Sequence, residues 1–406
     1  MDLPFDDDDN NVLGLSPSSS PSTPDCGGEC PAQGNDSSLL LEGNETRNYL
    51  NITTEIPIEY AQPLYGYCVP VLFVITIIAN TLVVVVLAKR HMRTPTNAVL
   101  MAMAISDMLT VLFPAPWLLY MYTFGNHYKP FYPLAACYAW SMMNETIPNF
   151  FHTASIWLTL ALAVQRYIYV CHAPVARSWC TMPRVLKGIT WIYVVAFLHQ
   201  STRFFDRVYV TTEIVWEGEL RPVCRMEHAQ WLNTITLDVY FNVYYWFRVI
   251  FIHFIPCVAL IVLNFLLFRA MRQAMQKRLQ LFKDKKTSES KKMRESNSTT
   301  IMLIVVVTVF LLVEVPLAVL TVLHIISSTL FEFLDYYVVN ICILFFNFFI
   351  IVSYPINFAI YCGMSRQFRE TFKDLFVRGG STAKRNGSSR YSLVNGPRTC
   401  TNETVL

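Results

Sequence analysis

Charged residues are scarce in this 406-residue chain, whereas long hydrophobic runs are abundant. Asp, Glu, Lys and Arg make up 15% of the sequence, against about 25% in an average soluble protein, and 53% of the residues are hydrophobic. The mean hydropathy is +0.36. This is too much apolar surface for one water-soluble core, so we exclude a soluble enzyme, a nucleic-acid-binding protein and a disordered scaffold.

Several functional motifs are also missing. The sequence has no His-Glu-x-x-His or Gly-x-Ser-x-Gly motif, which argues against a membrane enzyme. It has no lysine in Tyr337–Cys362, where a retinal photoreceptor would need one. No internal repeat is evident, which disfavours a secondary transporter without excluding it. Met1–Asp9 is acidic and lacks the apolar core of a cleavable signal peptide, so we expect the first span to direct insertion.

Seven stretches are long and apolar enough to cross a bilayer, whose core of about 30 Å needs roughly 20 apolar residues in a helix. The expected spans are Gly66–Leu87, Ala98–Met121, Trp140–Tyr169, Leu186–His199, Tyr244–Phe268, Ile301–Ile326 and Tyr337–Cys362. Lys187 and Arg203 limit the short fourth span, and Asn144, Glu145 and Pro148 interrupt the outer half of the third. We therefore predict an all-α membrane protein, a seven-transmembrane helix bundle.

The basic residues predict the orientation of the bundle. They concentrate in alternate loops and in the tail, at Lys89–Arg93, Arg177–Lys187, Arg269–Arg294 and Arg366–Arg398. These segments should face the cytosol of a plasma-membrane protein, with the N-terminus outside. We divide the chain into a disordered extracellular segment (1–62), the bundle (63–363), an amphipathic juxtamembrane helix (364–378) and a disordered cytoplasmic tail (379–406). Glycosylation is expected at Asn35, Asn44 and Asn51.

The segment between spans four and five should cross the mouth of the bundle as a hairpin. Strand-forming residues flank Glu217-Gly218, which is a turn signal. Cys224 in this segment and Cys137 at the start of span three both face an oxidising compartment, where a disulfide would persist. Two unrelated thiols are the alternative. A second pair, Cys26 and Cys30, is close enough in sequence to bridge locally.

Polar residues near mid-depth of the spans are expected to converge, because each is costly in lipid without a partner. They are Asn80, Asp107, Ser155, Glu314, Ser353 and Asn357. If Asp107 and Glu314 share one cavity, either one is protonated or a cation, such as a sodium ion near Asp107, lies between them. The alternative is a hydrogen-bonded packing element without an ion. No other cofactor or metal is expected. Pro316, two residues after Glu314, is either a hinge or a static kink.

Together these features resemble the rhodopsin-like family of G-protein-coupled receptors, over roughly Tyr65 to Phe376. The residues that carry the resemblance are Asn80, Ala104–Asp107, Cys137, Cys224, Gln165–Tyr167, Trp191, Pro256 and Pro316. The chain departs from the family at Gln165, where an acidic residue is usual. It departs again at Glu314, which replaces a tryptophan. The resemblance implies a receptor that is not an enzyme and that couples to a G protein through Arg166 and Tyr167.

The chain is more similar still to the invertebrate receptors for myoinhibitory peptides, through Ile156–His172, the glutamate–proline pair of span six and Tyr354–Phe358. This implies a ligand that is a short amidated peptide with Trp residues. It also implies an inhibitory-class G protein that lowers cyclic AMP. FMRFamide-type receptors are near relatives, so their peptides are the alternative ligands.

On this resemblance, a peptide would enter between the hairpin and the outer ends of the spans. The residues expected to line the entrance are Trp117, Tyr120, Trp140, Glu145 and His324. Packing or lipid contact is the alternative role for several of them. Peptide binding would move span six about Pro316 and open Arg166 to the G protein.

The tail suggests two further partners. Its hydroxyls could be phosphorylated and then bind arrestin: Ser381, Ser388, Ser389, Ser392, Thr399 and Thr401. The C-terminal Thr404, Val405 and Leu406 fit the pattern of a PDZ ligand, although so short a match is frequent by chance.

Overall fold

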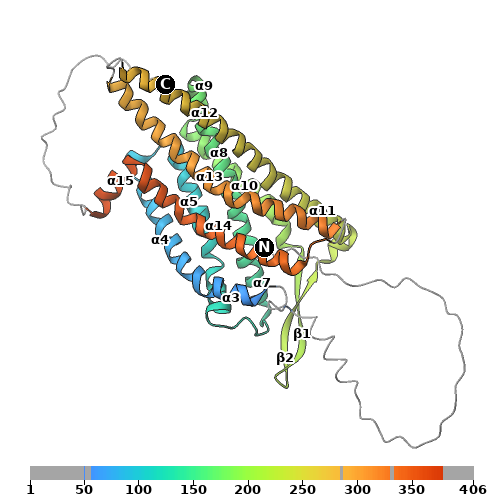
Figure 1. Cartoon of the computed structure of the whole chain (residues 1–406). Helices are drawn as coiled ribbons and strands as arrows, with labels where there is room; N and C mark the ends of the chain where they lie inside the picture. Colours follow the sequence, from blue (N-terminus) through green and yellow to red (C-terminus); the bar gives the residue numbers. More distant parts are fainter. Residues whose placement is uncertain (1–49, 51–55, 284–286, 330–332, 378–406) are drawn as a thin grey trace, which may run out of the picture.

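The computed structural model describes residue 50 and residues 56–377, apart from 284–286 and 330–332. Long helices form one bundle, and a two-stranded hairpin projects from one of its ends (Figure 1). In these residues six helical stretches are long and apolar enough to cross a membrane: Ile58–Leu87, Pro95–Thr123, Leu134–Cys171, Leu237–Gln276, Thr300–Ser328 and Tyr336–Met364. A seventh helix, α10 (Met182–Gln200), carries Arg184 and Lys187 and packs against spans two and three. The predicted seven-helix bundle is confirmed.

The elements follow the chain in a simple order. Span one comprises α3 (Ile58–Pro63), η1 (Leu64–Cys68) and α4 (Val69–Leu87); span two comprises α5 (Pro95–Leu112), α6 (Ala115–Leu118) and η3 (Leu119–Thr123). Span three comprises α7 (Leu134–Ser141), η4 (Met142–Thr146) and α8 (Ile147–Cys171), followed by α9 (Ala173–Trp179) and α10. Span five comprises α11 (Leu237–Phe247), η7 (Arg248–Phe254) and α12 (Ile255–Lys283). Spans six and seven are α13 (Thr287–Thr329) and α14 (Tyr336–Met364).

Short π-helical turns interrupt several spans next to prolines. The turn η4 ends just before Pro148, and η7 ends just before Pro256. Proline cannot donate a backbone hydrogen bond, and one wide turn lets the helix continue past it. Such a turn also shifts which side chains face the interior. The interruption expected in span three is therefore a wide turn within a continuous helix, and it carries Glu145.

Three helices continue well beyond the apolar stretches that predicted them. Span six was expected to begin at Ile301, whereas α13 begins at Thr287. Span five reaches Lys283 and span three begins at Leu134. Hydropathy marks the part of a helix that lipid covers, and the polar turns that follow can remain helical in water.

The hairpin forms as expected. The strands β1 (Arg207–Trp216) and β2 (Glu219–His228) pair antiparallel, with Trp216 opposite Glu219. The two residues between them, Glu217 and Gly218, have φ values of 52° and 82°, as a tight two-residue hairpin turn requires.

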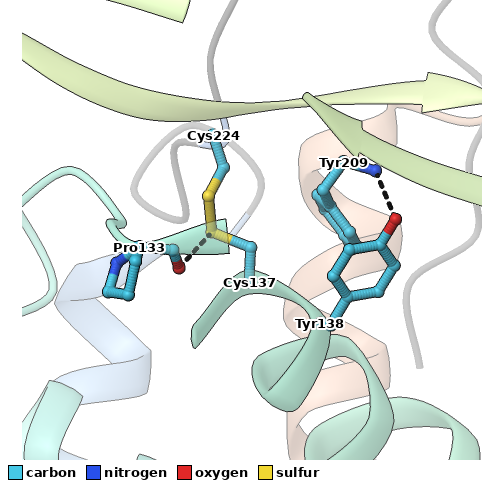
Figure 2. The surroundings of a disulfide bond; sticks show 5 residues. All are labelled: Pro133, Cys137, Tyr138, Tyr209 and Cys224. Atoms are coloured by element: carbon cyan, nitrogen blue, oxygen red, sulfur yellow. Dashed lines mark hydrogen bonds between the residues drawn. A yellow bond between two sulfur atoms is a disulfide. The ribbon is translucent and has the colours of Figure 1, made fainter. Parts of the chain in front are cut away.

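A disulfide joins this hairpin to the bundle. Cys224 on β2 is bonded to Cys137 on α7, as predicted (Figure 2). Beside it, the backbone N–H of Tyr209 donates to the hydroxyl of Tyr138 at 3.1 Å (Figure 2). The hairpin is thus attached to span three by a covalent bond and a hydrogen bond.

A short helix follows span seven. It consists of α15 (Arg366–Phe372) and η8 (Lys373–Val377), with Ser365 as an N-cap that accepts from the N–H of Phe368. Phe368 is fully buried, with its ring 5.8 Å from that of Tyr361 in span seven. The amphipathic helix expected here is present.

Candidate functional site

A cavity of about 180 Å³ lies between spans one, two, three and seven, in the half of the bundle that carries the hairpin. Aromatic and aliphatic side chains form most of its wall, and four asparagines contribute carboxamides: Asn144, Asn149, Asn340 and Asn347. No Asp, Glu, Lys or Arg lines it among the described residues. The cavity therefore suits an uncharged ligand group that can both pack against rings and form hydrogen bonds.

Three of the residues predicted to contact a peptide form one aromatic group near this cavity. The ring of Trp117 lies 5.8 Å from that of Trp140 and 6.4 Å from that of Tyr120, and Phe131 packs against both tryptophans. Trp140 lines the cavity and is buried, whereas Tyr120 is 45% exposed. His324 stands apart from this group and is buried beside Tyr336 in span seven.

Glu145 does not face the cavity. Its carboxylate forms ion pairs with Arg203 and with Arg207, the latter at 2.6 Å, and Arg203 also pairs with Asp206. All four side chains are largely buried. Burial alone would lower the pKa of Arg207, but the attraction of Glu145 raises it above its ordinary value. For Asp206, burial raises the pKa even though Arg203 opposes the rise. These groups fix the first residue of β1 to span three.

Two residues of the cavity wall connect it to Glu314. His152 and Tyr354 both line the cavity, and the Nδ1 atom of His152 lies 3.2 Å from the Tyr354 hydroxyl. The other ring nitrogen of His152 is 3.1 Å from Oε1 of Glu314, and Nδ1 of His253 is 3.6 Å from Oε2. Glu314 is 2% exposed and stands two residues before Pro316. Spans three, five and six thus meet at one carboxylate, and Tyr354 connects span seven to it through His152.

The six polar residues predicted to converge do not all do so. Asp107 accepts hydrogen bonds from Ser155 at 2.7 Å and from Asn357 at 3.4 Å, which joins spans two, three and seven. Asn80 and Ser353 instead donate to carbonyls of their own helices. Glu314 belongs to the histidine group described above, and His152 is near enough to Asp107 to interact electrostatically. Carboxylate, hydroxyl and amide oxygens around Asp107 are ligands that suit a small hard cation.

At the other end of the bundle, Arg166 lines a cavity of about 1,000 Å³ between spans two, three, six and seven and the helix α15. Its guanidinium lies 5.9 Å from the ring of Tyr169, and no described carboxylate forms an ion pair with it. Tyr167 points elsewhere, with its ring beside that of His172. Because Gln165 cannot pair with it, Arg166 is held by packing and by its contact with an aromatic ring.

Some predicted sites fall outside the described residues. These are the sequons Asn35, Asn44 and Asn51, the pair Cys26 and Cys30, the tail hydroxyls, and the C-terminal Thr404 and Leu406. Three buried residues that matter here were not predicted from the sequence: His152, His253 and Arg248. The sequence could have indicated all three, because an ionisable residue within a span is itself a reason to expect a function.

The comparisons with known proteins agree with this architecture. The sequence model described as serpentine type 7TM GPCR chemoreceptor Srw matches residues 67–379. The sex peptide receptor of Drosophila melanogaster is 60% identical over 88% of this chain and 83% of its own. Sex peptide receptor-related protein 2 of Caenorhabditis elegans is 36% identical over 78% of this chain and 72% of its own. The FMRFamide receptor of Drosophila melanogaster is 27% identical over 77% of this chain and 54% of its own.

Proposed function

The chain belongs to the rhodopsin-like G-protein-coupled receptors, which are not enzymes, and we propose that it is a receptor for short amidated neuropeptides of the myoinhibitory and sex peptide type. It signals through an inhibitory-class G protein and lowers cyclic AMP. Its N-terminus is extracellular and glycosylated, and its C-terminus is cytosolic. The names of the Drosophila and Caenorhabditis relatives support a peptide ligand, and the basic cytosolic loops support this orientation.

One observation supports this function above the others. The cavity in the hairpin half of the bundle has an uncharged, aromatic and carboxamide-lined wall, and His152, one of the two partners of Glu314, is part of that wall. An aromatic side chain and an uncharged C-terminal amide both fit such a wall. A ligand that displaces His152 or Tyr354 would disturb Glu314 beside Pro316. That disturbance would favour the outward position of span six and open the cavity at Arg166.

Other residues have supporting roles in this proposal. Trp117, Tyr120, Trp140 and His324 contact the peptide, whereas Glu145 acts through its arginines by holding the hairpin. A sodium ion bound at Asp107 would stabilise the inactive arrangement of spans two, three and seven. Phosphorylated tail hydroxyls would recruit arrestin, and the C-terminal residues would bind a PDZ protein.

The test is a signalling assay in transfected cells. We expect an amidated myoinhibitory peptide to reduce forskolin-stimulated cyclic AMP, in a manner that pertussis toxin blocks. The same peptide as a free acid should be much weaker, because a carboxylate lacks the N–H groups that a terminal carboxamide can donate to the asparagine side chains of the cavity. Uptake of labelled solute without a nucleotide-exchange response would instead identify a transporter.

FMRFamide is the second ligand to test, since the FMRFamide receptor is a relative. If FMRFamide has a lower half-maximal concentration than every myoinhibitory peptide, the ligands are instead FMRFamide-like peptides. No response to any peptide, at normal surface expression, would reject the proposed function.

A further inference from the structure

Arg248 is a buried cation that has no carboxylate partner among the described residues. It is the first residue of η7 in span five and is 6% exposed. Its Nη2 atom donates to Oδ1 of Asn149 at 3.2 Å, and no described acid forms an ion pair with it. A buried guanidinium charge needs compensation from a partner.

Two other arginines that are largely buried in this half of the molecule differ in this respect. Arg203 and Arg207 share the carboxylate of Glu145, and Arg203 also pairs with Asp206. Their charges are thus compensated by carboxylates of the chain itself. An intramembrane ionisable residue that the protein leaves unpaired is, by contrast, a candidate for binding.

The donors of Arg248 remain available to a ligand. Neither Nε nor Nη1 has a described hydrogen-bond acceptor, and neither is among the fully enclosed polar atoms of the described residues. The planar guanidinium presents its N–H groups as a fork that fits two oxygen lone pairs. Arg248 can only donate, so Oδ1 of Asn149 accepts its hydrogen bond, and the amide N–H₂ of Asn149 is a further donor beside it. Asn149 lines the cavity described above, so a ligand in that cavity is adjacent to this pair.

We propose that Arg248 and Asn149 together bind an acceptor oxygen of the ligand. The oxygen is either a side-chain carboxylate of the peptide or the carbonyl of its C-terminal carboxamide. This inference rests on the proposed peptide-receptor function and adds the recognition chemistry of one end of the site. It also predicts specificity, since a basic peptide residue at this position would be repelled.

Ligand binding at Arg248 would also act on span six. Arg248 lies close enough to His253 to interact with it electrostatically, and His253 faces Glu314. A carboxylate bound to Arg248 would offset its positive charge on one side of His253, and a carbonyl oxygen would partly screen that charge. The electrostatic interaction between His253 and Glu314 then changes. Glu314 stands beside Pro316, where span six can bend.

The experiment compares Arg248→Gln and Arg248→Lys with the wild type, using an amidated myoinhibitory peptide as the probe. Surface expression and competition binding are measured with the cyclic AMP response. Arg248→Gln should weaken binding by about thirtyfold or more, because it removes one partner of a buried charged hydrogen bond. Arg248→Lys should weaken it by about tenfold, since an ammonium keeps the charge but loses the fork. Arg221→Gln, on the exposed hairpin, is the matched control and should bind normally.

Altered peptides separate the two sources of oxygen. If a side-chain carboxylate is bound, replacing that acid by its amide should weaken the wild type but not Arg248→Gln. If the terminal carbonyl is bound, replacing the carboxamide by an alkylamine should have that effect instead. Wild-type binding by both Arg248 variants at normal surface expression would overturn the inference. A wild type that binds no peptide at all would instead refute the proposed function.

Discussion

Replacing Glu145 by glutamine should destabilise the receptor rather than remove a peptide contact. Its carboxylate is buried and serves two arginines, with Arg207 at 2.6 Å. Glutamine has nearly the same shape but no charge. After the change Arg203 still has Asp206, whereas Arg207 keeps no described ion-pair partner. The first residue of β1 would then carry an uncompensated cation into a largely buried position.

The expected loss of stability can be estimated from this geometry. Breaking a buried ion pair by removing one partner costs about 3–5 kcal/mol, because the other charge stays buried. We expect about 3 kcal/mol here, since Arg203 retains Asp206 and the Arg207 side chain is 12% exposed. At about 2–4 °C per kcal/mol, the melting temperature should fall by about 6–12 °C.

The assay is thermal unfolding of the detergent-solubilised receptor, together with peptide competition binding at a temperature where both proteins are folded. Glu219→Gln is the matched control, because the pair of Glu219 with Arg221 is exposed and should change the melting temperature by only about 1–2 °C. In Glu145→Gln/Arg207→Gln the uncompensated cation is gone, so the loss should be smaller than the sum of the two single losses. An unchanged melting temperature combined with a large loss of peptide affinity would refute this reasoning and make Glu145 a ligand-binding residue.

Three other changes should have distinct outcomes. The disulfide spans 87 residues, so Cys137→Ser/Cys224→Ser should lose about 4 kcal/mol of stability, seen as a lower melting temperature that reductant no longer affects. Glu314→Gln should raise basal inhibition of cyclic AMP, because it weakens the contact of span six with His152; unchanged basal activity would favour a pure packing role. Arg166→Ala should abolish the cyclic AMP response and change peptide affinity less than threefold (about 0.65 kcal/mol); a preserved response would exclude Arg166 from coupling.

The spans and the hairpin could be predicted because each depends on local sequence. A run of about 20 apolar residues has few alternatives in lipid, and Glu217-Gly218 adopts the positive φ values that a two-residue turn demands. The helix ends could not be predicted in this way. Hydropathy carries no information on polar turns beyond the membrane, so the start of α13 at Thr287 was missed.

The partners of the buried charges were also beyond sequence reasoning. Glu145 was expected at a peptide entrance, and its place on a π-helical turn instead directs it toward Arg203 and Arg207. One extra residue in a turn rotates the following side chains by about 100°, and no propensity scale anticipates it. Glu314 was recognised as unusual, but His152 and His253 become its neighbours only when spans three, five and six pack together.

A carboxylate in place of an aromatic ring changes what the movement of span six requires. A tryptophan can slide between packed positions, whereas Glu314 must leave His152 in span three if the helix bends outward about Pro316. A buried carboxylate that loses a partner is costly, so the active arrangement needs either a proton on Glu314 or a closer contact with His253, which already lies 3.6 Å away. His253 is on span five, close enough to Arg248 to interact with it electrostatically, so a ligand carboxylate on Arg248 would favour the second route. In this receptor, charge compensation across spans three, five and six would therefore couple the ligand to the helix that moves.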